Sequence, residues 1–524
     1  MAKSRMDLGL GAKAAHTIYP LFVGNALGVI IAGFKIIIAT RLLGPALFGM
    51  YVFIVSYYSL IGSVNDLGIS SYFKKYAAEL DYKKDGEGMQ RMLSAGFFVV
   101  TGVSLLLAVI GIALSGFVAS GSFNSVGATQ QLLELGSVVL FTTIMFGALS
   151  SILIGLGEGR RYSLAYLTFM ASDFIITVYS LLAGYGAFGI LIGTLVGSVL
   201  GIILSLFYVR KHLNSYMSFC PWRFEAFNIK RVLGFAWPLA ISNFLTNSMS
   251  NFSVIFIGFF VSGIGIGNYG TALKGLIVLS VFYSSVVTVL LPTFSEAAKK
   301  NRGKEYNEGV FNASVLYSVF VTFPILLYFA VFSKSLIYFF IGSSYALAPA
   351  YLTLIAIGTI IGLVGSFSST LLTARGLTYK MLKYGAVSSL LQFVAMLSLV
   401  PYFGVIGAIA GIFFIGSVAN TLLFSSAVRK IIGIRLQKLK LLRLVAANMA
   451  LLGLMLIPRF AFGSVVMEAL VGGAILVIVY PALVAVSGAI NKKELDYFRN
   501  STAKLFVAGR FIGWIVRYME IVGG

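Results

Sequence analysis

Apolar runs of about 20 residues recur along the whole chain, and they constrain its fold more than any other feature. A helix needs about 20 apolar residues to cross the hydrocarbon core of a bilayer. The sequence therefore predicts an all-α, polytopic membrane protein with about 14 transmembrane helices. The fourteen runs span 17–42, 48–72, 92–117, 132–156, 162–184, 187–209, 232–260, 269–292, 310–332, 350–373, 382–401, 404–427, 441–459 and 465–489.

Composition excludes several other classes of protein. Of the 524 residues, 59% are hydrophobic and only 11% are charged, and no polar stretch is long enough to bury a soluble core of its own. The single cysteine, Cys220, excludes an internal disulfide and a cysteine metal cluster. The two histidines, His16 and His212, are far apart in the sequence, so we expect no metal site. We read the basic-then-apolar N-terminus as a retained first span.

The positive charge follows the predicted topology. The net charge is +22, and 34 of the 39 lysines and arginines fall before the first span, in alternate loops or after the last span. The positive-inside rule therefore predicts that both termini are cytoplasmic in a multi-pass protein of the cell (plasma or inner) membrane. We expect these cations to contact anionic membrane lipids. Nucleic-acid binding would need a basic domain, and the sequence contains none.

The chain also shows a weak internal duplication. With a shift of 218, residues 22–51 overlay 240–269, so that Asn25 meets Asn243, Gly49 meets Gly267 and Tyr51 meets Tyr269. Each half holds six spans, an even number, so both halves point the same way. This arrangement predicts two parallel-repeat six-helix bundles around a central cavity, with substrate bound between them.

The spans and loops suggest five segments. The predicted segments are an N-terminal six-helix bundle at 1–209, a cytoplasmic linker at 210–231, a C-terminal six-helix bundle at 232–430, two additional transmembrane helices at 431–490 and a cytoplasmic amphipathic tail at 491–524. In the tail, Arg510, Arg517 and Glu520 share one helical face, which is typical of an interfacial helix. A docking surface for another protein is the alternative for this tail.

Four charged residues stand out among those inside predicted spans, where charge is costly and usually functional. Lys35 and Lys274 belong to opposite halves, so they could hold an anionic headgroup together across the cavity, or each could snorkel to the outer interface. Asp173 lies near the middle of its span, and three readings stay open: it pairs with a lysine, binds a coupling ion or proton, or hydrogen-bonds within its bundle. Asp66 is a second ion-coupling candidate, or a cap of its helix.

An asparagine stripe marks the first span of the second half. Asn243, Asn247 and Asn251 are four residues apart, so they share one helical face. Buried amides need partners. They could line a hydrated cavity and bind sugar hydroxyls or phosphate, together with the duplicated Asn25, or they could join neighbouring helices.

No motif in the sequence supports catalysis. Gly265, Gly267 and Gly270 match G-x-G-x-x-G but follow a membrane helix without any βαβ context. Walker A, H-E-x-x-H and G-x-S-x-G motifs do not occur in the sequence. We therefore expect no catalytic residues, no metal, no cofactor and no enzymatic activity.

Residues 41–80 resemble a known family. The Arg41-Leu-Leu-Gly44-Pro45 turn, Phe48-Gly49 and Tyr51, then a span ending in Gly68, are similar to the polysaccharide-type flippases of the multidrug/oligosaccharidyl-lipid/polysaccharide (MOP) exporter superfamily. This resemblance implies two six-helix bundles, alternating access, and transport of polyprenyl-(pyro)phosphate-linked oligosaccharides to the outer leaflet. It also implies cavity cations in spans 1 and 8, which contain Lys35 and Lys274, and other polysaccharide-assembly proteins as partners of the tail. We assign Arg41 to the turn or an outer gate.

Other functions remain to be weighed against a flippase. A sodium- or proton-coupled multidrug or metabolite antiporter of the same superfamily would need cavity carboxylates, of which Asp173 is the central one. A membrane glycosyltransferase would need catalytic residues on sizeable outer loops, and the predicted outer loops are short. A non-transporting scramblase or scaffold would leave no signature in the sequence.

Overall fold

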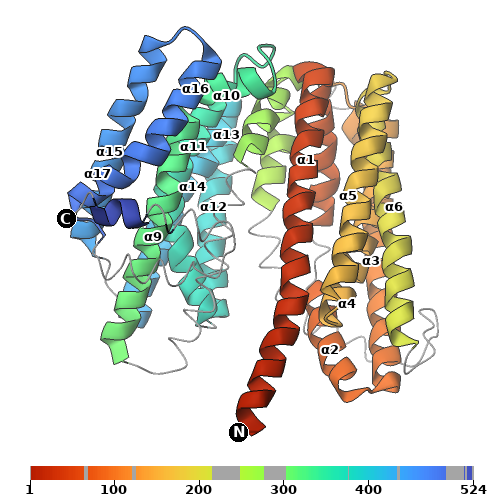
Figure 1. Ribbon diagram of the computed structural model, residues 1–524. Coiled ribbons are helices and arrows are strands. Elements are labelled where there is room, and N and C mark those ends of the chain that lie inside the picture. Colours follow the sequence, from red (N-terminus) through yellow and green to blue (C-terminus); the bar gives the residue numbers. More distant parts are fainter. Residues whose placement is uncertain are drawn as a thin grey trace. The chain divides into compact units, whose positions relative to one another are not determined.

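A computed structural model describes residues 2–63, 69–120, 126–214, 248–276, 303–375, 377–433 and 437–490, with Gly513 and 516–521. All regular structure in these ranges is helical (Figure 1). Eleven of the helices described are long and apolar enough to cross a membrane. The predicted all-α, polytopic membrane fold is therefore confirmed, while the total of fourteen spans stays a prediction. The chain divides into two compact units, Met1–Gly267 and Asn268–Gly524.

The first unit contains six labelled helices. They are α1 (Ala2–Gly62), α2 (Ile69–Lys83), α3 (Gly86–Ser120), α4 (Gln130–Gly155), α5 (Gly159–Leu182) and α6 (Gly186–Leu213). Two further helical segments follow, Ser248–Ile257 and 263–276, and the unit boundary falls inside the second of them.

Helix α1 is two helices joined at Gly44. Its apolar part, Tyr19–Gly62, has 44 residues, which at 1.5 Å per residue is about 66 Å, roughly twice the bilayer core. At Gly44 the backbone is non-helical (φ 70°, ψ 175°), a conformation that glycine adopts without a Cβ clash, and Pro45 starts the next helix. The first two predicted spans, 17–42 and 48–72, are thus separated where the sequence analysis expects a break.

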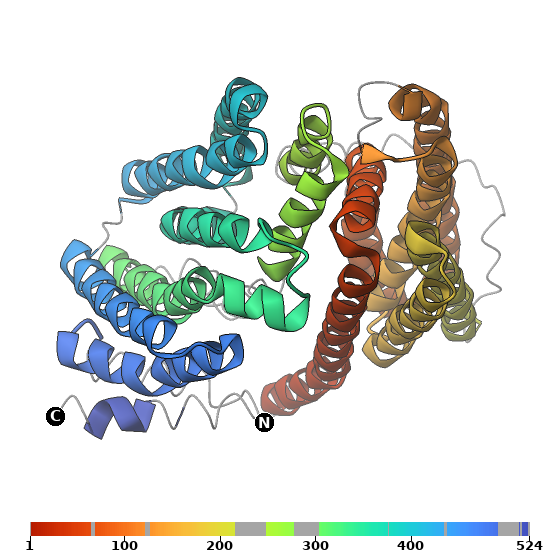
Figure 2. The same ribbon diagram turned by 90° about the horizontal axis from the view of Figure 1, so that it is seen from above.

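Glycines allow α5 and α6 to pack closely. Gly189, Gly193, Gly197 and Gly201 recur every four residues along α6, so they form one stripe. A Cβ added at Gly193 would collide with Thr177 Oγ1, and one added at Gly197 would meet the backbone carbonyl of Phe169. Small residues of this kind let membrane helices approach until their backbones nearly touch. Both views show the two helices side by side (Figure 1 and Figure 2).

Helix α1 packs against α5 in the same way, and the two run parallel. Gly24 lies against Ser163, and Gly28 lies against the ring of Tyr166. The Ser163 hydroxyl also donates a 2.6 Å hydrogen bond to the carbonyl of Pro20. Residue numbers rise together along both helices. These contacts therefore determine which residues of α1 and α5 lie opposite each other further along the interface.

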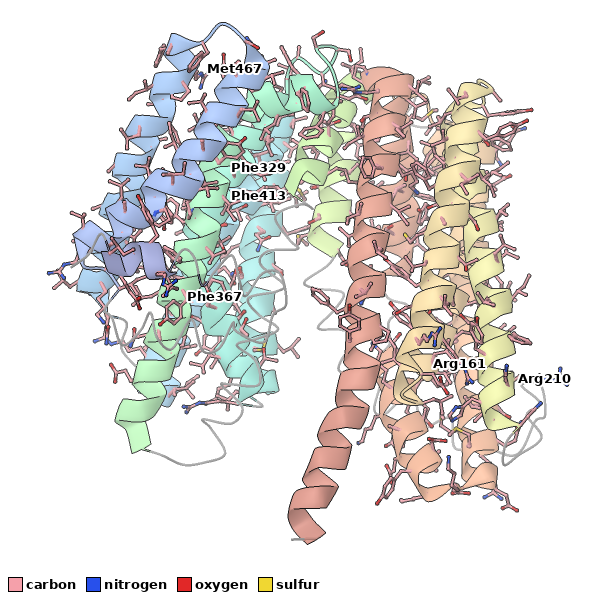
Figure 3. All side chains as sticks on the ribbon, viewed as in Figure 1. Arg161, Arg210, Phe329, Phe367, Phe413 and Met467 are labelled. Atoms are coloured by element: carbon pink, nitrogen blue, oxygen red, sulfur yellow. The ribbon has the colours of Figure 1, made fainter. Side chains whose placement is uncertain are left out.

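The second unit is built around one large apolar core. Its labelled helices are α9 (Gly303–Val331), α10 (Ser333–Phe340), α11 (Ala348–Ala374), α12 (Thr378–Phe403), α13 (Val405–Ile409), η2 (Ala410–Ile415), α14 (Gly416–Ala427), η3 (Val428–Ile432), α15 (Lys438–Ala461), α16 (Val465–Ala474), η4 (Ile475–Val479) and α17 (Tyr480–Ser487). Phe367 on α11 is fully buried in this core (Figure 3). Asn268 caps α11, because its Oδ1 accepts hydrogen bonds from the amides of Leu347 and Ala348.

The two additional helices share this core. The hydroxyl of Tyr480, at the start of α17, donates a 3.0 Å hydrogen bond to the carbonyl of Phe320 on α9. Asn448 on α15 donates to the same hydroxyl at 3.4 Å. In the predicted tail, Val516 and Met519 are 1% exposed and belong to the same core. The described part of the tail therefore packs on the second unit, and its place at the membrane interface stays a prediction.

Candidate functional site

A buried ion pair joins α1 to α5. Lys35 lies seven residues after Gly28, and Asp173 lies seven residues after Tyr166, so each is two turns further along the packed interface. The Nζ of Lys35 is 2.6 Å from Oδ2 of Asp173. The side chains are 13% and 4% exposed. Of the three readings left open for Asp173, the structure shows pairing with a lysine.

Two threonines complete the surroundings of the carboxylate. Thr177, one turn along α5, and Thr194 on α6 each donate a hydrogen bond of 3.2 Å to Oδ1 of Asp173. Both oxygens of the carboxylate therefore have donors, as a charge removed from water requires. The sequence analysis did not single out these threonines. The four-residue spacing of Asp173 and Thr177 on α5, and the place of Thr194 next to Gly193 in the glycine stripe of α6, are the signals that could have identified them.

Asn25 lies on the same interface, two to three turns before Lys35. Its Oδ1 accepts a 3.1 Å hydrogen bond from the hydroxyl of Tyr162, and its side chain is exposed. The Tyr162 ring stacks on that of Tyr166, with 5.9 Å between centroids and 6° between planes. The sequence-predicted residues Asn25, Lys35 and Asp173 thus share the α1–α5 interface.

The other predicted site residues are placed only in part. Asn251 is half-buried on Ser248–Ile257, and Arg41 is exposed three residues before the break at Gly44. Asn243, Asn247 and Asp66 lie outside the described residues. Lys274 is half-buried and belongs to the second unit, so its facing Lys35 across a cavity stays a prediction.

The break in α1 also touches the segment that the duplication equates with it. A Cβ on Gly49 would collide with the carbonyl oxygen of Gly263, and one on Gly267 would collide with that of Pro45. Under the shift of 218, 45 corresponds to 263 and 49 to 267. Each segment therefore contacts the other reciprocally, as two-fold-related segments do. The sequence overlay aligned Gly49 with Gly267 but did not predict this contact.

Cations gather at one end of the first unit. Arg161 near the start of α5 and Arg210 near the end of α6 lie at the same end of these antiparallel helices (Figure 3). Among the residues that the structure describes, no group of three His, Cys, Asp or Glu side chains could hold a metal ion.

Comparisons with known proteins agree with this architecture. The sequence pattern of a family described as "Polysaccharide biosynthesis protein" matches residues 38–350, more than half of the chain. No curated protein sequence matches the chain.

Solved structures share the fold at low sequence identity. A lipid II flippase, MurJ, in its inward closed conformation, is similar with a TM-score of 0.71 and 16% identity over 89% of this chain and 98% of that one. An inward-facing multidrug resistance MATE transporter of the MOP superfamily is similar with a TM-score of 0.61 and 17% identity, over 78% of this chain and 94% of that one. A MOP superfamily transporter from Pyrococcus furiosus is similar with a TM-score of 0.52 and 16% identity, over 80% of this chain and 96% of that one. The chain therefore belongs to the polysaccharide biosynthesis protein family and has the fold of MOP-superfamily flippases and transporters.

Proposed function

We propose that the protein is a flippase that moves a polyprenyl-(pyro)phosphate-linked oligosaccharide from the cytoplasmic to the outer leaflet. It would act by alternating access in the cell (plasma or inner) membrane, with both termini cytoplasmic, for assembly of a surface polysaccharide or glycan. The family assignment and the fold similarity to a lipid II flippase support this proposal. The chain would be a transporter and not an enzyme.

The observation that carries the substrate class is the ion pair between Lys35 and Asp173. Placing a lysine inside a membrane span, with a side chain only 13% exposed, costs free energy. Lysines in such positions therefore usually serve a function. An ammonium group is a strong partner for a phosphate oxygen. We assign Lys35 and Lys274 to the phosphates, and Asn25, Asn243, Asn247 and Asn251 to the sugars.

Asp173 gives Lys35 a resident counter-ion. A (pyro)phosphate can bind Lys35 only if the carboxylate releases it. The two threonine donors on Oδ1 can keep the carboxylate in place while Nζ turns to the substrate. Binding of the anion and release of Asp173 are then two sides of one exchange. Whether Asp173 gains a proton or a metal cation in that exchange decides the driving force, with the membrane potential as the alternative. Asp66 is the second candidate for ion coupling.

The competing function is a sodium- or proton-coupled multidrug or metabolite antiporter. Similarity to MATE transporters is the observation in its favour. A cationic drug needs an available carboxylate, and Asp173 is neutralised by Lys35 at 2.6 Å. Lys35 is occupied by the same contact, so the preference for an anionic substrate rests on Lys274, the second lysine assigned to the phosphates, and on the family assignment.

Reconstitution separates the two functions. The full-length protein is placed in liposomes, and the inner-to-outer movement of a fluorescent polyprenyl-diphosphate sugar is followed. The flippase proposal predicts movement above that of protein-free liposomes. No movement with several sugars, alongside dye efflux driven by a sodium or proton gradient, would replace it with the antiporter.

A further inference from the structure

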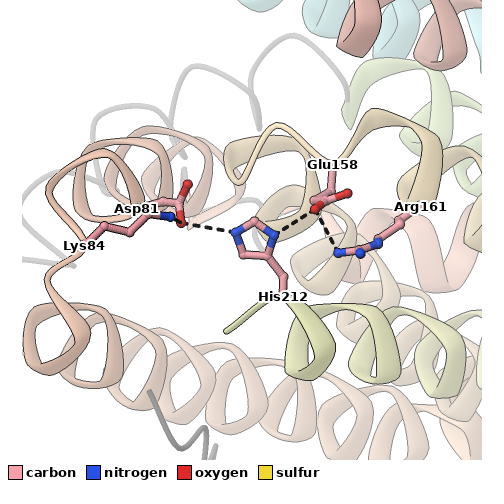
Figure 4. A network of polar contacts seen from close by, with 5 residues as sticks. All are labelled: Asp81, Lys84, Glu158, Arg161 and His212. Carbon is pink, nitrogen blue, oxygen red and sulfur yellow. Dashed lines mark hydrogen bonds and ion pairs between the residues drawn. The ribbon is translucent and has the colours of Figure 1, made fainter. Parts of the chain in front are cut away.

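His212 ties together three segments at the cation-rich end of the first unit. Its Nδ1 lies 2.7 Å from Oε1 of Glu158, in the turn before α5, and its Nε2 lies 3.1 Å from Oδ1 of Asp81, near the end of α2 (Figure 4). The three side chains are between 18% and 25% exposed. The ring of one α6 residue thus bridges two carboxylates that are 77 positions apart in the chain.

The two contacts of the His212 ring each need a donor nitrogen. An ionised carboxylate only accepts hydrogen bonds, while a neutral imidazole has one donor and one acceptor nitrogen. Both ring nitrogens face carboxylate oxygens, so both can be satisfied only when both carry protons. A neutral ring would keep one hydrogen bond and turn a lone pair toward the other carboxylate. Only the imidazolium form can donate to both carboxylates in this geometry.

Two neighbouring cations contact the same carboxylate oxygens. Arg161 donates to the same Glu158 oxygen at 2.8 Å, and Lys84 lies 3.1 Å from the same Asp81 oxygen. Both cations oppose the imidazolium, but Lys84 is 60% exposed and is therefore screened by water. On α6 itself, Arg210 and Lys211 precede the histidine.

Two further ion pairs lie on the packed elements. On α3, Glu87 pairs with Arg91. On α2, Glu79 pairs with Lys83 at 2.8 Å, which raises the pKa of that lysine. Among the described residues, the carboxylates of Asp81 and Glu158 contact the ring directly.

The bridge matters because α2 is not a membrane span. It is a 15-residue helix, polar on average, that rests on α3 and α4 through Tyr72, Phe73 and Ala77. The Asp81–His212 contact joins its far end to α6, and the Glu158–His212 contact joins the same ring to the start of α5. Loss of the proton from His212 removes one of these two joints.

We propose that His212 is a pH-sensitive clasp that fastens the ends of α2, α5 and α6 into one body. The clasp is closed when the ring is an imidazolium and both carboxylates are ionised. It opens on the Asp81 side, where the contact is longer, as rising pH removes the ring proton. This inference concerns the first unit alone and does not depend on the substrate.

Distance measurements on the full-length protein test the clasp. Spin labels are placed on Tyr82→Cys at the end of α2 and Asn214→Cys after α6, in a Cys220→Ser background; both labelled positions are exposed. Distances are recorded at about pH 6 and about pH 9, on either side of the range in which histidine usually changes charge. We expect one narrow distribution at the lower pH, and loss of that population in favour of a broad one at the higher pH.

Variants distinguish the clasp from general destabilisation. His212→Arg, which donates to both carboxylates at every pH, should give the narrow distribution at both values. His212→Gln, with one donor and one acceptor, should give the broad one at both. His16→Gln, at the chain's other histidine, should keep the wild-type response.

Two results would overturn the proposal: identical wild-type distributions at both pH values, or a pH response that survives in His212→Arg. If His212→Gln does not fold, the comparison of wild type, His212→Arg and His16→Gln still shows whether the pH response depends on His212.

Discussion

The ammonium nitrogen of Lys35 and the carboxylate oxygen Oδ2 of Asp173 lie 2.6 Å apart, although 138 residues separate them in the sequence. The contact exists because Gly24 and Gly28 bring α1 close to α5 in parallel register. It converts two costly intramembrane charges into one neutral pair. The pair therefore has a structural role and a proposed functional one, and these can be separated.

Removing one partner should destabilise the protein, and removing both should restore much of the loss. Lys35→Met or Asp173→Leu leaves an unpaired buried charge, for which we expect a loss of about 3–5 kcal/mol of unfolding free energy. Lys35→Met with Asp173→Leu leaves apolar side chains and should approach wild-type stability. Thermal unfolding in detergent measures all three. If the two single variants and the double variant lost the same unfolding free energy, a direct pair would be contradicted. Lys75→Met, at an exposed lysine, is the control.

Close packing of α5 and α6 should depend on the glycine stripe. In Gly193→Val the new side chain would collide with Thr177 and with the backbone of Asp173, so we expect a loss of at least about 1–3 kcal/mol. It should also disturb the threonine that binds Asp173. Gly147→Val is the matched control, because a Cβ there meets nothing within 4 Å. Comparable melting temperatures of the two variants would argue against the stripe.

The reciprocal contact at the break in α1 gives a third test. Gly49→Ala places a methyl group against the carbonyl of Gly263, and Gly267→Ala places one against that of Pro45. Backbone cannot move aside as a flexible side chain can, so each variant should lower the melting temperature and the yield of folded protein. Gly33→Ala on the same helix meets nothing within 4 Å and should be neutral or slightly stabilising. If Gly33→Ala and Gly49→Ala behave alike, the contact has no energetic weight.

Labelling tests the predicted orientation. In a Cys220→Ser background, a membrane-impermeant maleimide applied to intact cells should react with Tyr185→Cys, between α5 and α6, and not with Tyr82→Cys, at the end of α2. Both tyrosines are exposed, at 60% and 87%. Permeabilisation should expose Tyr82→Cys. The reverse pattern would invert the topology that the loop charges predict.

Hydropathy predicted the described spans well because burial in lipid constrains every residue of a crossing helix. The interval between 42 and 48 already indicated a break, and the structure places it at Gly44. Helix partners could not be predicted in the same way. Periodicity shows that Gly24, Gly28 and Lys35 share a face, but it does not show that α5 covers that face.

The candidate site shows the same limit. Asp173 was identified by its depth in the span, but its partners were not. Lys35 and Thr194 lie on other helices, α1 and α6, and Thr177 lies one turn further along α5 on a face that the sequence analysis did not consider. His212 was considered only as a metal ligand, because a single sequence does not reveal that Asp81 and Glu158 flank it. Pairing across elements is a property of tertiary packing, which spacing along one helix does not encode.

The most direct test of the proposed function combines transport with the two lysines. Liposomes containing wild type, Lys35→Ala, Lys274→Ala or the exposed-surface control Lys75→Ala are loaded with the fluorescent polyprenyl-diphosphate sugar, and its movement to the outer leaflet is measured on samples matched for folded protein. We predict that each of the two intramembrane variants loses transport, while Lys75→Ala retains it. Wild-type rates in both Lys35→Ala and Lys274→Ala would contradict the assignment of these lysines to the substrate phosphates.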